Sequence, residues 1–256
     1  MTFEFTTQIG CPVMCLKYCP QDIILKNYTG EKTLTLANHK RFLSTVPKRE
    51  TIIYSGLAEP FANEHCIDMI EHAHEKGHKI WLFTTLVGVT PDIAERIIKI
   101  PFDWFCLHLP DSKGYARIPI TTTYKDSLGI ILGGVENITY MNMGGKFHTH
   151  KTEDLARGKE FPKKTGAIWC ERFESPQYNV LPNGDVYFCC TTDRFASPRK
   201  GADSVIGNMH DDMYLDLEMK FESLVAELKG PDSICRYCPA SEVWWKRKVY
   251  EFVAKR

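Results

Sequence analysis

The chain has ten cysteines among its 256 residues, and their spacing points to metal chemistry. Three of them lie within nine residues near the N-terminus: Cys11, Cys15 and Cys19. Five more lie in the last third of the chain: Cys170, Cys189, Cys190, Cys235 and Cys238. In a chain of this length without an export signal, closely spaced thiols more often bind metals or do redox chemistry than form disulfides. We therefore predict two separate metal centres, and we expect the isolated Cys66 and Cys106 to be small core residues.

The N-terminal thiols have the arrangement expected of an iron–sulfur cluster with one open iron. Three thiolates in a loop directly after a strand can bind one face of a cluster and leave one metal corner without a protein ligand. A structural zinc site normally has four protein ligands, and no histidine or fourth cysteine lies nearby in the sequence. The loop thus predicts a site-differentiated 4Fe-4S cluster. A zinc site completed from elsewhere and buried thiols without a metal are the alternatives.

The loop around these thiols resembles the cluster loop of the radical S-adenosylmethionine (SAM) superfamily. The similar segment runs from Thr6 to Cys11, continues at Cys15 and ends at Tyr18-Cys19-Pro20, where an aromatic residue precedes the third cysteine as it commonly does in that family. The spacing here is C-x3-C-x3-C, one residue longer than the usual C-x3-C-x2-C. The resemblance implies that the unique iron binds SAM and that Tyr18 packs against its adenine.

A second resemblance lies after the second predicted strand, in the segment from Ser55 to Pro60. Radical SAM proteins carry a Gly-Gly-Glu-Pro-like segment there that binds the methionine amino group of SAM, and this chain keeps Gly56, Glu59 and Pro60. Glycine lets the backbone approach a ligand, and a carboxylate can accept charge-assisted hydrogen bonds from an ammonium group. An ordinary strand-to-helix turn is the alternative.

Two further strand ends resemble SAM-contacting positions of the family. Thr84-Thr85 ends the third predicted strand, and the segment from Leu107 to Asp111 ends the fourth. The resemblance implies that Thr85 and His108 touch the ribose or the carboxylate of SAM. The alternative for His108 is a histidine in the core or at its rim that makes its hydrogen bonds within the protein.

The C-terminal cysteines resemble the auxiliary-cluster region of the SPASM and twitch branches of the superfamily. Cys170, Gly184 and Cys189 match its opening pattern C-x9-15-G-x4-C, in which the glycine turns a hairpin so that the two cysteines can meet. Cys190 is an alternative to Cys189, but adjacent side chains on a strand point to opposite faces, so only one of the two should reach the metal.

Cys235 and Cys238 resemble the closing pair of that region. No cysteine follows Cys238, which implies the short twitch arrangement with one auxiliary 4Fe-4S cluster. Four thiolates would ligate this cluster fully, so its role would be electron transfer or structural support. A four-cysteine zinc ribbon is the alternative.

The elements that must position these residues alternate between strands and helices in the N-terminal part. Strands are predicted over 3–8, 51–54, 79–85, 104–109 and 138–143. Helices are predicted after a cap at Asn63 as far as Gly77, over 91–98 and over 122–132. This order predicts βαβ units and a parallel sheet, open or partly closed. With the resemblance, the expected fold is α/β: a partial (β/α) parallel barrel with a small C-terminal α+β twitch extension.

We expect a radical SAM partial barrel over residues 1–145, a connecting segment over 146–165 and the twitch domain over 166–256. Within the last unit, Asn183-Gly184 between two apolar runs predicts a hairpin of 178–181 with 185–188. Helices are predicted over 213–228 and 241–254.

The composition excludes several classes of partner. Lys plus Arg and Asp plus Glu both number 32, so the chain as a whole has no electrostatic reason to bind nucleic acid or an anionic membrane. No window holds 18 uninterrupted apolar residues. We predict a cytoplasmic protein without nucleic-acid or membrane partners.

Together these resemblances imply a radical SAM oxidoreductase with SAM and two 4Fe-4S clusters, served by an external flavodoxin- or ferredoxin-like electron donor. SAM would be cleaved to methionine and a 5′-deoxyadenosyl radical that abstracts hydrogen from the substrate. We expect a dehydrogenase-like oxidation of a small molecule, with the auxiliary cluster as electron acceptor. A radical SAM peptide maturase and a non-catalytic iron–sulfur or zinc protein are the alternatives. No residue is assigned as a catalytic acid or base.

Overall fold

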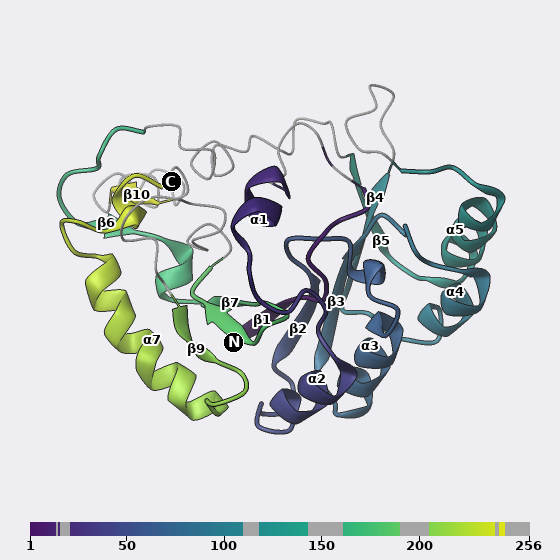
Figure 1. Ribbon diagram of the computed structural model, residues 1–256, viewed down its shortest axis with the longest axis horizontal. Coiled ribbons are helices and arrows are strands. Elements are labelled where there is room, and N and C mark those ends of the chain that lie inside the picture. Colours follow the sequence, from purple (N-terminus) through teal and green to yellow (C-terminus); the bar gives the residue numbers. More distant parts are fainter. Residues whose placement is uncertain are drawn as a thin grey trace, which may run out of the picture.

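The computed structural model describes residues 1–13, 15, 21–109, 118–142, 161–189, 205–238 and 241–243. One eight-stranded sheet runs through this part of the chain in the order β5-β4-β3-β2-β1-β7-β8-β9 (Figure 1). Neighbouring strands are parallel from β5 to β7, and β8 and β9 complete the sheet as antiparallel strands. The strands are β1 (Thr2–Thr6), β2 (Thr51–Ser55), β3 (Lys79–Thr84), β4 (Trp104–Leu109), β5 (Ile138–Asn142), β7 (Gln177–Val180), β8 (Asp185–Tyr187) and β9 (Val205–Asn208).

Helices cover one face of this sheet. In the described ranges the α-helices are α1 (Gln21–Asn27), α2 (Leu36–Leu43), α3 (Cys66–Glu75), α4 (Pro91–Ile97), α5 (Thr122–Gly134) and α7 (Tyr214–Leu228). Short 3-10 turns are η1 (Pro60–Ala62), η2 (Glu171–Phe173) and η3 (Ile234–Arg236), and a small antiparallel pair joins β6 (Ile168–Trp169) to β10 (Glu242–Val243). None of the described helices combines the length and the apolar character needed to cross a bilayer.

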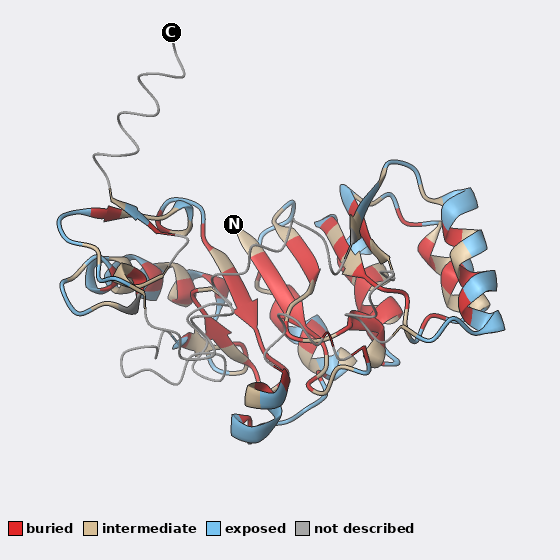
Figure 2. Cartoon of the chain, turned by 90° about the horizontal axis from the view of Figure 1, so that it is seen from above, coloured by how far each residue is buried: buried red, intermediate tan, exposed pale blue. Residues whose placement is uncertain are grey.

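The core lies between the sheet and helices α2–α5 and α7. Side chains alternate along each strand, so on β1 Phe3 and Phe5 face the helices while Glu4 and Thr6 face the opposite side. The ring of Phe5 lies 5.0 Å from that of His39 and 6.0 Å from that of Phe42, measured between centroids. Figure 2 shows the buried central strands and the exposed outer faces of the helices. This packing fixes β1, from which the first cysteine loop departs.

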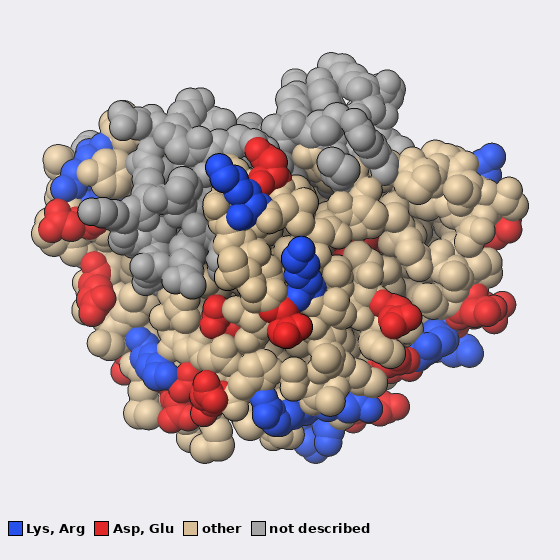
Figure 3. Space-filling model, in the orientation of Figure 1, with Lys and Arg blue, Asp and Glu red and all other residues tan. Residues whose placement is uncertain are grey.

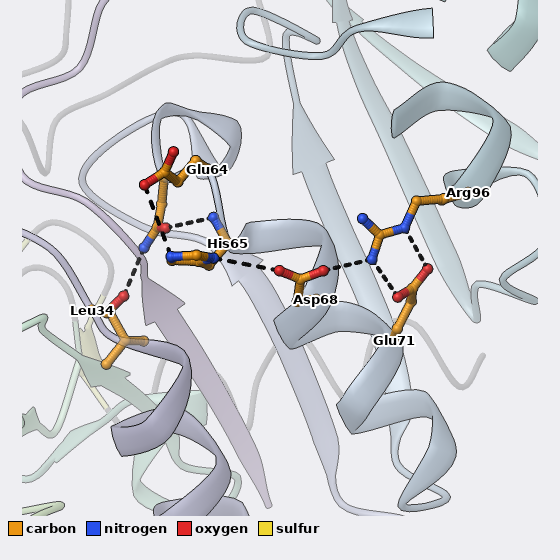
Figure 4. A network of polar contacts seen from close by, with 7 residues as sticks. Leu34, Glu64, His65, Asp68, Glu71 and Arg96 are labelled. Carbon is orange, nitrogen blue, oxygen red and sulfur yellow. Dashed lines mark hydrogen bonds and ion pairs between the residues drawn. The ribbon is translucent and has the colours of Figure 1, made fainter. Parts of the chain in front are cut away.

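Charged residues of both signs are interspersed on the visible face (Figure 3). A cluster of ion pairs joins α3 to α4. In it, Arg96 donates two hydrogen bonds to the carboxylate of Glu71 and one to that of Asp68 (Figure 4). Arg96 holds the pKa of Asp68 below its ordinary value, and the side chain of His65 adds to this effect. The α3–α4 pair is thereby fixed on the outside of the sheet.

The predicted fold class is confirmed: the sheet is mostly parallel, open and flanked by helices. The strand predicted over 104–109 has the bounds of β4, and the predicted hairpin is the β7–β8 pair. The prediction of a cap at Asn63 is wrong. The helix α3 begins at Cys66 with His65 in the cap position. The Oδ1 atom of Asn63 accepts from the N–H of His65 at 2.9 Å, and its Nδ2 atom donates to the carbonyls of Thr7 and Leu34, at 2.9 and 2.8 Å.

The prediction of a C-terminal helix over 241–254 is also wrong for the residues of this range that the structure describes. Glu242 and Val243 form β10, because their backbone pairs with Trp169 and Ile168 of β6. Residues 244–254 lie outside the described residues, as does most of the predicted connecting segment. The sheet itself continues from β1 into β7, so the N-terminal and C-terminal parts share one sheet.

We predict that Phe5→Ala lowers the free energy of unfolding by about 3–5 kcal/mol, because it removes a fully buried ring and leaves a cavity under β1. The measurement is a denaturant titration at fixed cofactor loading. The control is Leu132→Ala, which truncates an exposed side chain on α5 and should change the free energy by less than about 0.5 kcal/mol. Equal effects of the two substitutions would contradict the packing described for β1.

Candidate functional site

The first cysteine loop and the segment after β2 meet at Cys11. The backbone N–H of Glu59 donates to the Sγ atom of Cys11 at 3.3 Å, across 48 residues of sequence. The side chain of Gln21 at the start of α1 also lies between the two segments, since it accepts from the Cys11 N–H at 3.3 Å and donates to the carbonyl of Leu57. The structure therefore brings the first thiol and the Gly-x-x-Glu-Pro segment into direct contact.

Gly56 allows this segment to lie close to β1. Its φ is +89°, and a Cβ atom placed there would lie 2.1 Å from the Oγ1 atom of Thr6. Thr6 uses that hydroxyl twice: it accepts from the N–H of Leu57 at 3.0 Å and donates to the Oδ1 atom of Asn179 at 3.3 Å. Any other residue at position 56 would be strained by its backbone angle and by this contact.

Glu59 joins the same segment to the end of β3. It is only 4% exposed, and its carboxylate accepts from the Thr84 hydroxyl at 2.5 Å and from the Thr85 N–H and hydroxyl at 2.7 and 2.6 Å. Burial raises the pKa of Glu59, whereas these hydrogen bonds lower it. Glu59 thus fixes the ends of β2 and β3 relative to each other. Contacts of Glu59 and Thr85 with SAM stay predictions.

Two of the three N-terminal thiols lie together. Cys15 is buried against Val13, and Cys11 packs against the same cluster with Val87 from the loop after β3. Cys19 and Tyr18 lie outside the described residues. The described part of the loop thus places Cys11 beside the Gly-x-x-Glu-Pro segment, which is predicted to bind SAM.

His108 lies on the face of β4 opposite the helices. Its ring centroid is 6.3 Å from that of Phe83, and Phe83 in turn lies 4.9 Å from Trp104. Trp81 completes this half-buried group at 5.0 Å from Trp104. This aromatic group was not predicted from the sequence, although the alternation along β3 and β4 places these side chains on one face. A contact of His108 with SAM stays a prediction.

The four predicted auxiliary ligands gather in the C-terminal part. Cys170 follows β6, Cys189 follows β8, and Cys235 and Cys238 lie at and after η3. Burial raises the pKa of the Cys235 thiol most, and the thiols of Cys189, Cys238 and Cys170 raise it further. In the part of the chain that the structure describes, no three His, Cys, Asp or Glu side chains converge on a point that could hold a single metal ion.

The backbone around these thiols is held by Arg236 and Gly184. The guanidinium of Arg236 donates to four backbone carbonyls at 2.6–3.0 Å: those of Gly230, Lys164, Gly166 and Lys229. Gly184 has a φ of +89° in the turn between β7 and β8, and a Cβ atom there would lie 2.6 Å from the Oδ1 atom of Asn208. The hairpin therefore requires a glycine at this position of its turn, as the sequence predicts. Cys190 lies outside the described residues.

Comparisons with known proteins agree with this geometry. Residues 170–239 match the model of the SPASM family, described as an iron–sulfur cluster-binding domain. The fold is similar to a crystal structure of BtrN in complex with AdoMet and 2-DOIA, with a TM-score of 0.61, 16% identity and coverage of 94% of this chain and 92% of BtrN. It is also similar to native anSMEcpe with bound AdoMet and the Cp18Cys peptide, with a TM-score of 0.52, 13% identity and coverage of 98% and 94%. No curated protein sequence matches the chain.

We predict that Gly56→Ala weakens SAM binding and lowers the free energy of unfolding by about 1–3 kcal/mol, because a Cβ atom at this angle meets Thr6. The measurements are equilibrium binding of SAM and a denaturant titration. Gly129→Ala is the matched control: it lies in α5 with open space around its Cβ position, so the substitution should be neutral or stabilising. Normal SAM affinity in Gly56→Ala would contradict the role given to this glycine.

We also predict that Arg236→Lys lowers the iron content, because an ammonium group cannot donate in the planar fork that holds four carbonyls around Cys235 and Cys238. Iron should fall from about eight toward about four per chain if only the auxiliary cluster is lost. Iron analysis after desalting measures this. The control is Lys125→Ala, which removes an exposed cation on α5. Full iron loading of Arg236→Lys would show that this anchor is dispensable.

Proposed function

We propose that this chain, which has the fold and the iron–sulfur domain of a radical SAM protein of the twitch type, is a radical SAM enzyme that oxidises a small molecule. The observation that carries the proposal is the contact between Glu59 and Cys11. It joins the cysteine loop to the Gly-x-x-Glu-Pro segment, which the alternative of a metal-binding protein without SAM chemistry does not explain.

The residues present fit the two cofactors. Cys11, Cys15 and Cys19 would hold a 4Fe-4S cluster, and an N–H donated to the sulfur of the first is the kind of hydrogen bond that tunes such clusters. SAM would bind beside it through five residues: Tyr18, Gly56, Glu59, Thr85 and His108. When bound and reduced, this cluster supplies the electron that cleaves SAM to methionine and a 5′-deoxyadenosyl radical.

The protein's own part in this chemistry is to position the first cysteine and the segment proposed to bind SAM. Gln21 and Glu59 both hydrogen-bond to Cys11, and Gln21 also donates to the carbonyl of Leu57, so these contacts tie the cluster loop to the segment after β2. Glu59 in turn is fixed by the threonines at the end of β3. Reacting groups that are held in position react faster because the entropy cost of orienting them has already been met during folding and binding. Cys15 and Glu59 are both buried at this edge.

The auxiliary centre supports an oxidative outcome. Four thiolates, from Cys170, Cys189, Cys235 and Cys238, would ligate a second 4Fe-4S cluster fully and leave no iron open for substrate. Such a cluster suits the role of electron acceptor after hydrogen abstraction, and an external flavodoxin- or ferredoxin-like protein would supply the first electron. The likeness to BtrN bound to 2-DOIA supports a small-molecule substrate. The likeness to anSMEcpe bound to a peptide makes peptide modification the second candidate.

The test is anaerobic reconstitution with iron and sulfide, followed by dithionite and SAM. We predict that the wild-type protein forms 5′-deoxyadenosine and that Cys15→Ala forms none above background, because it loses a cluster ligand. The matched control is Cys66→Ala, which removes a thiol from the core of α3, where burial raises its pKa and keeps it unreactive. This variant should still cleave SAM.

Equal yields of 5′-deoxyadenosine from wild type and Cys15→Ala would refute the enzyme assignment. Metal analysis of the same preparations adds a second readout. Iron and sulfide near about eight each per chain agree with two four-iron clusters. Stoichiometric zinc in place of iron would favour the non-catalytic alternative.

A further inference from the structure

Lys164 is a half-buried cation that is held against the C-terminal cysteines. Its Nζ atom donates to the backbone carbonyl of Cys238 at 2.5 Å. Its backbone is tied to the same segment twice: the N–H of Lys164 donates to the carbonyl of Arg236 at 3.0 Å, and the carbonyl of Lys164 accepts from the Nη1 atom of Arg236 at 3.0 Å. Because Arg236 lies between Cys235 and Cys238 in the sequence, the ammonium group is fixed beside the closing pair of proposed ligands.

The ammonium group of Lys164 interacts with three of the four proposed ligands. Burial lowers the pKa of Lys164, and the charges of the thiols of Cys238, Cys235 and Cys170 raise it. The hydrogen bond to the Cys238 carbonyl fixes this position independently of any charge on the thiols. A cluster bound by these cysteines would therefore have a cation as a neighbour.

No carboxylate neutralises this cation within the part of the chain that the structure describes. The adjacent Lys163 is different, because its Nζ atom pairs with the Oδ1 atom of Asp232 at 3.7 Å and its side chain is more exposed to solvent. Lys164 has no carboxylate within ion-pair distance among the described residues, and its Nζ atom contacts the Cys238 carbonyl instead. Its positive charge is thus directed at the proposed cluster rather than at an acidic side chain.

Other charges near these thiols offset one another or hold the backbone. At the Cys170 thiol, burial raises the pKa, the backbone and the charge of Arg172 lower it, and the charge of Glu171 raises it. Arg172 and Glu171 thus act in opposite directions. Arg236 is a further cation, but its guanidinium donates to four backbone carbonyls, so removing it would also loosen the segment. The charge of Lys164 can be removed separately.

A fixed positive charge beside an iron–sulfur cluster stabilises the reduced form of the cluster. Reduction adds one electron, so the charge of the cluster becomes more negative by one unit. Attraction to a nearby cation then lowers the free energy of the reduced form relative to that of the oxidised form. Water and salt screen this attraction less when the cation is partly buried.

We propose that Lys164 raises the reduction potential of the auxiliary cluster and thereby makes it a better electron acceptor. Lys164 acts through the cluster and is a positioning residue, not a catalytic one. This inference rests on the proposed function, in which the substrate radical is oxidised by losing one electron and one proton, and the auxiliary cluster is reduced by that electron. The alternative is that Lys164 only holds the carbonyl of Cys238.

The experiment is a redox titration of the reconstituted full-length chain, monitored by electron paramagnetic resonance, with dithionite as reductant and without SAM or substrate. The auxiliary signal is the one that persists in Cys15→Ala. Lys164→Gln removes the charge but keeps a donor for the Cys238 carbonyl, and Lys164→Arg keeps the charge. Lys163→Gln is the matched control, since it makes the same change at the neighbouring exposed lysine.

We expect Lys164→Gln to lower the midpoint potential of the auxiliary cluster. At a fixed applied potential, the ratio of reduced to oxidised cluster should fall at least about threefold, which is about 28 mV for a one-electron couple. Lys164→Arg should keep the wild-type potential because it keeps the charge. Lys163→Gln should shift the potential by less than half as much, because the charge of Lys163 is exposed and paired with Asp232.

An unchanged potential in a fully iron-loaded Lys164→Gln protein, or an equal shift in Lys163→Gln, would overturn the proposal. Loss of the auxiliary iron from Lys164→Gln would also overturn it, because Lys164 would then have a structural role. Iron content and formation of 5′-deoxyadenosine are measured in parallel on the wild-type protein. A protein that cleaves SAM and holds both clusters but shows no shift in Lys164→Gln refutes the role of Lys164 alone. A wild-type protein without an auxiliary cluster refutes the oxidative function first, and the role of Lys164 with it.

Discussion

The hydrogen bond from the N–H of Glu59 to the sulfur of Cys11 is the contact on which the arrangement of the site depends. It joins the loop after β1 to the segment after β2, and the carboxylate of the same residue reaches the threonines at the end of β3. Parallel strands have their carboxyl ends at one edge of the sheet, which is where ligands bind in open α/β folds. One residue thus ties three successive strand ends into a single site.

The sheet connects this site to the C-terminal cysteines. β1 leads directly into the loop of Cys11, and its other neighbour, β7, belongs to the hairpin that leads to Cys189. The Thr6–Asn179 hydrogen bond bridges these two strands across 173 residues of sequence. The two groups of cysteines are thus attached to adjacent strands of one sheet. The SPASM match over residues 170–239 agrees with an iron–sulfur centre at that end.

Much of this could be predicted from the sequence because local patterns carry it. Apolar runs between turn signals predicted β1 to β5, and Asn183-Gly184 predicted the β7–β8 hairpin. The spacing of the C-terminal cysteines predicted the iron–sulfur region that matches over residues 170–239, whereas the cluster at the N-terminal cysteines stays a prediction. The helices α1 and α2 were not predicted, although Thr35 caps α2 by accepting from the N–H of Asn38. The short length of both helices gives only a weak periodic signal.

The unpredicted parts of the site depend on contacts between distant segments. Gln21 reaches Cys11 and Leu57, and the ammonium group of Lys164 reaches the carbonyl of Cys238. Nothing local in the sequence specifies these contacts.

We propose that the N-terminal cluster keeps one iron open for SAM. Pulsed electron–nuclear double resonance of the reduced protein, with SAM labelled with ¹⁵N at its amino group, measures whether the amino group binds that iron. We expect a nitrogen hyperfine coupling to the reduced cluster, which Cys235→Ala should retain because the auxiliary centre does not produce it. A cluster signal without any coupling from the labelled nitrogen would show that SAM does not bind the cluster through its amino group.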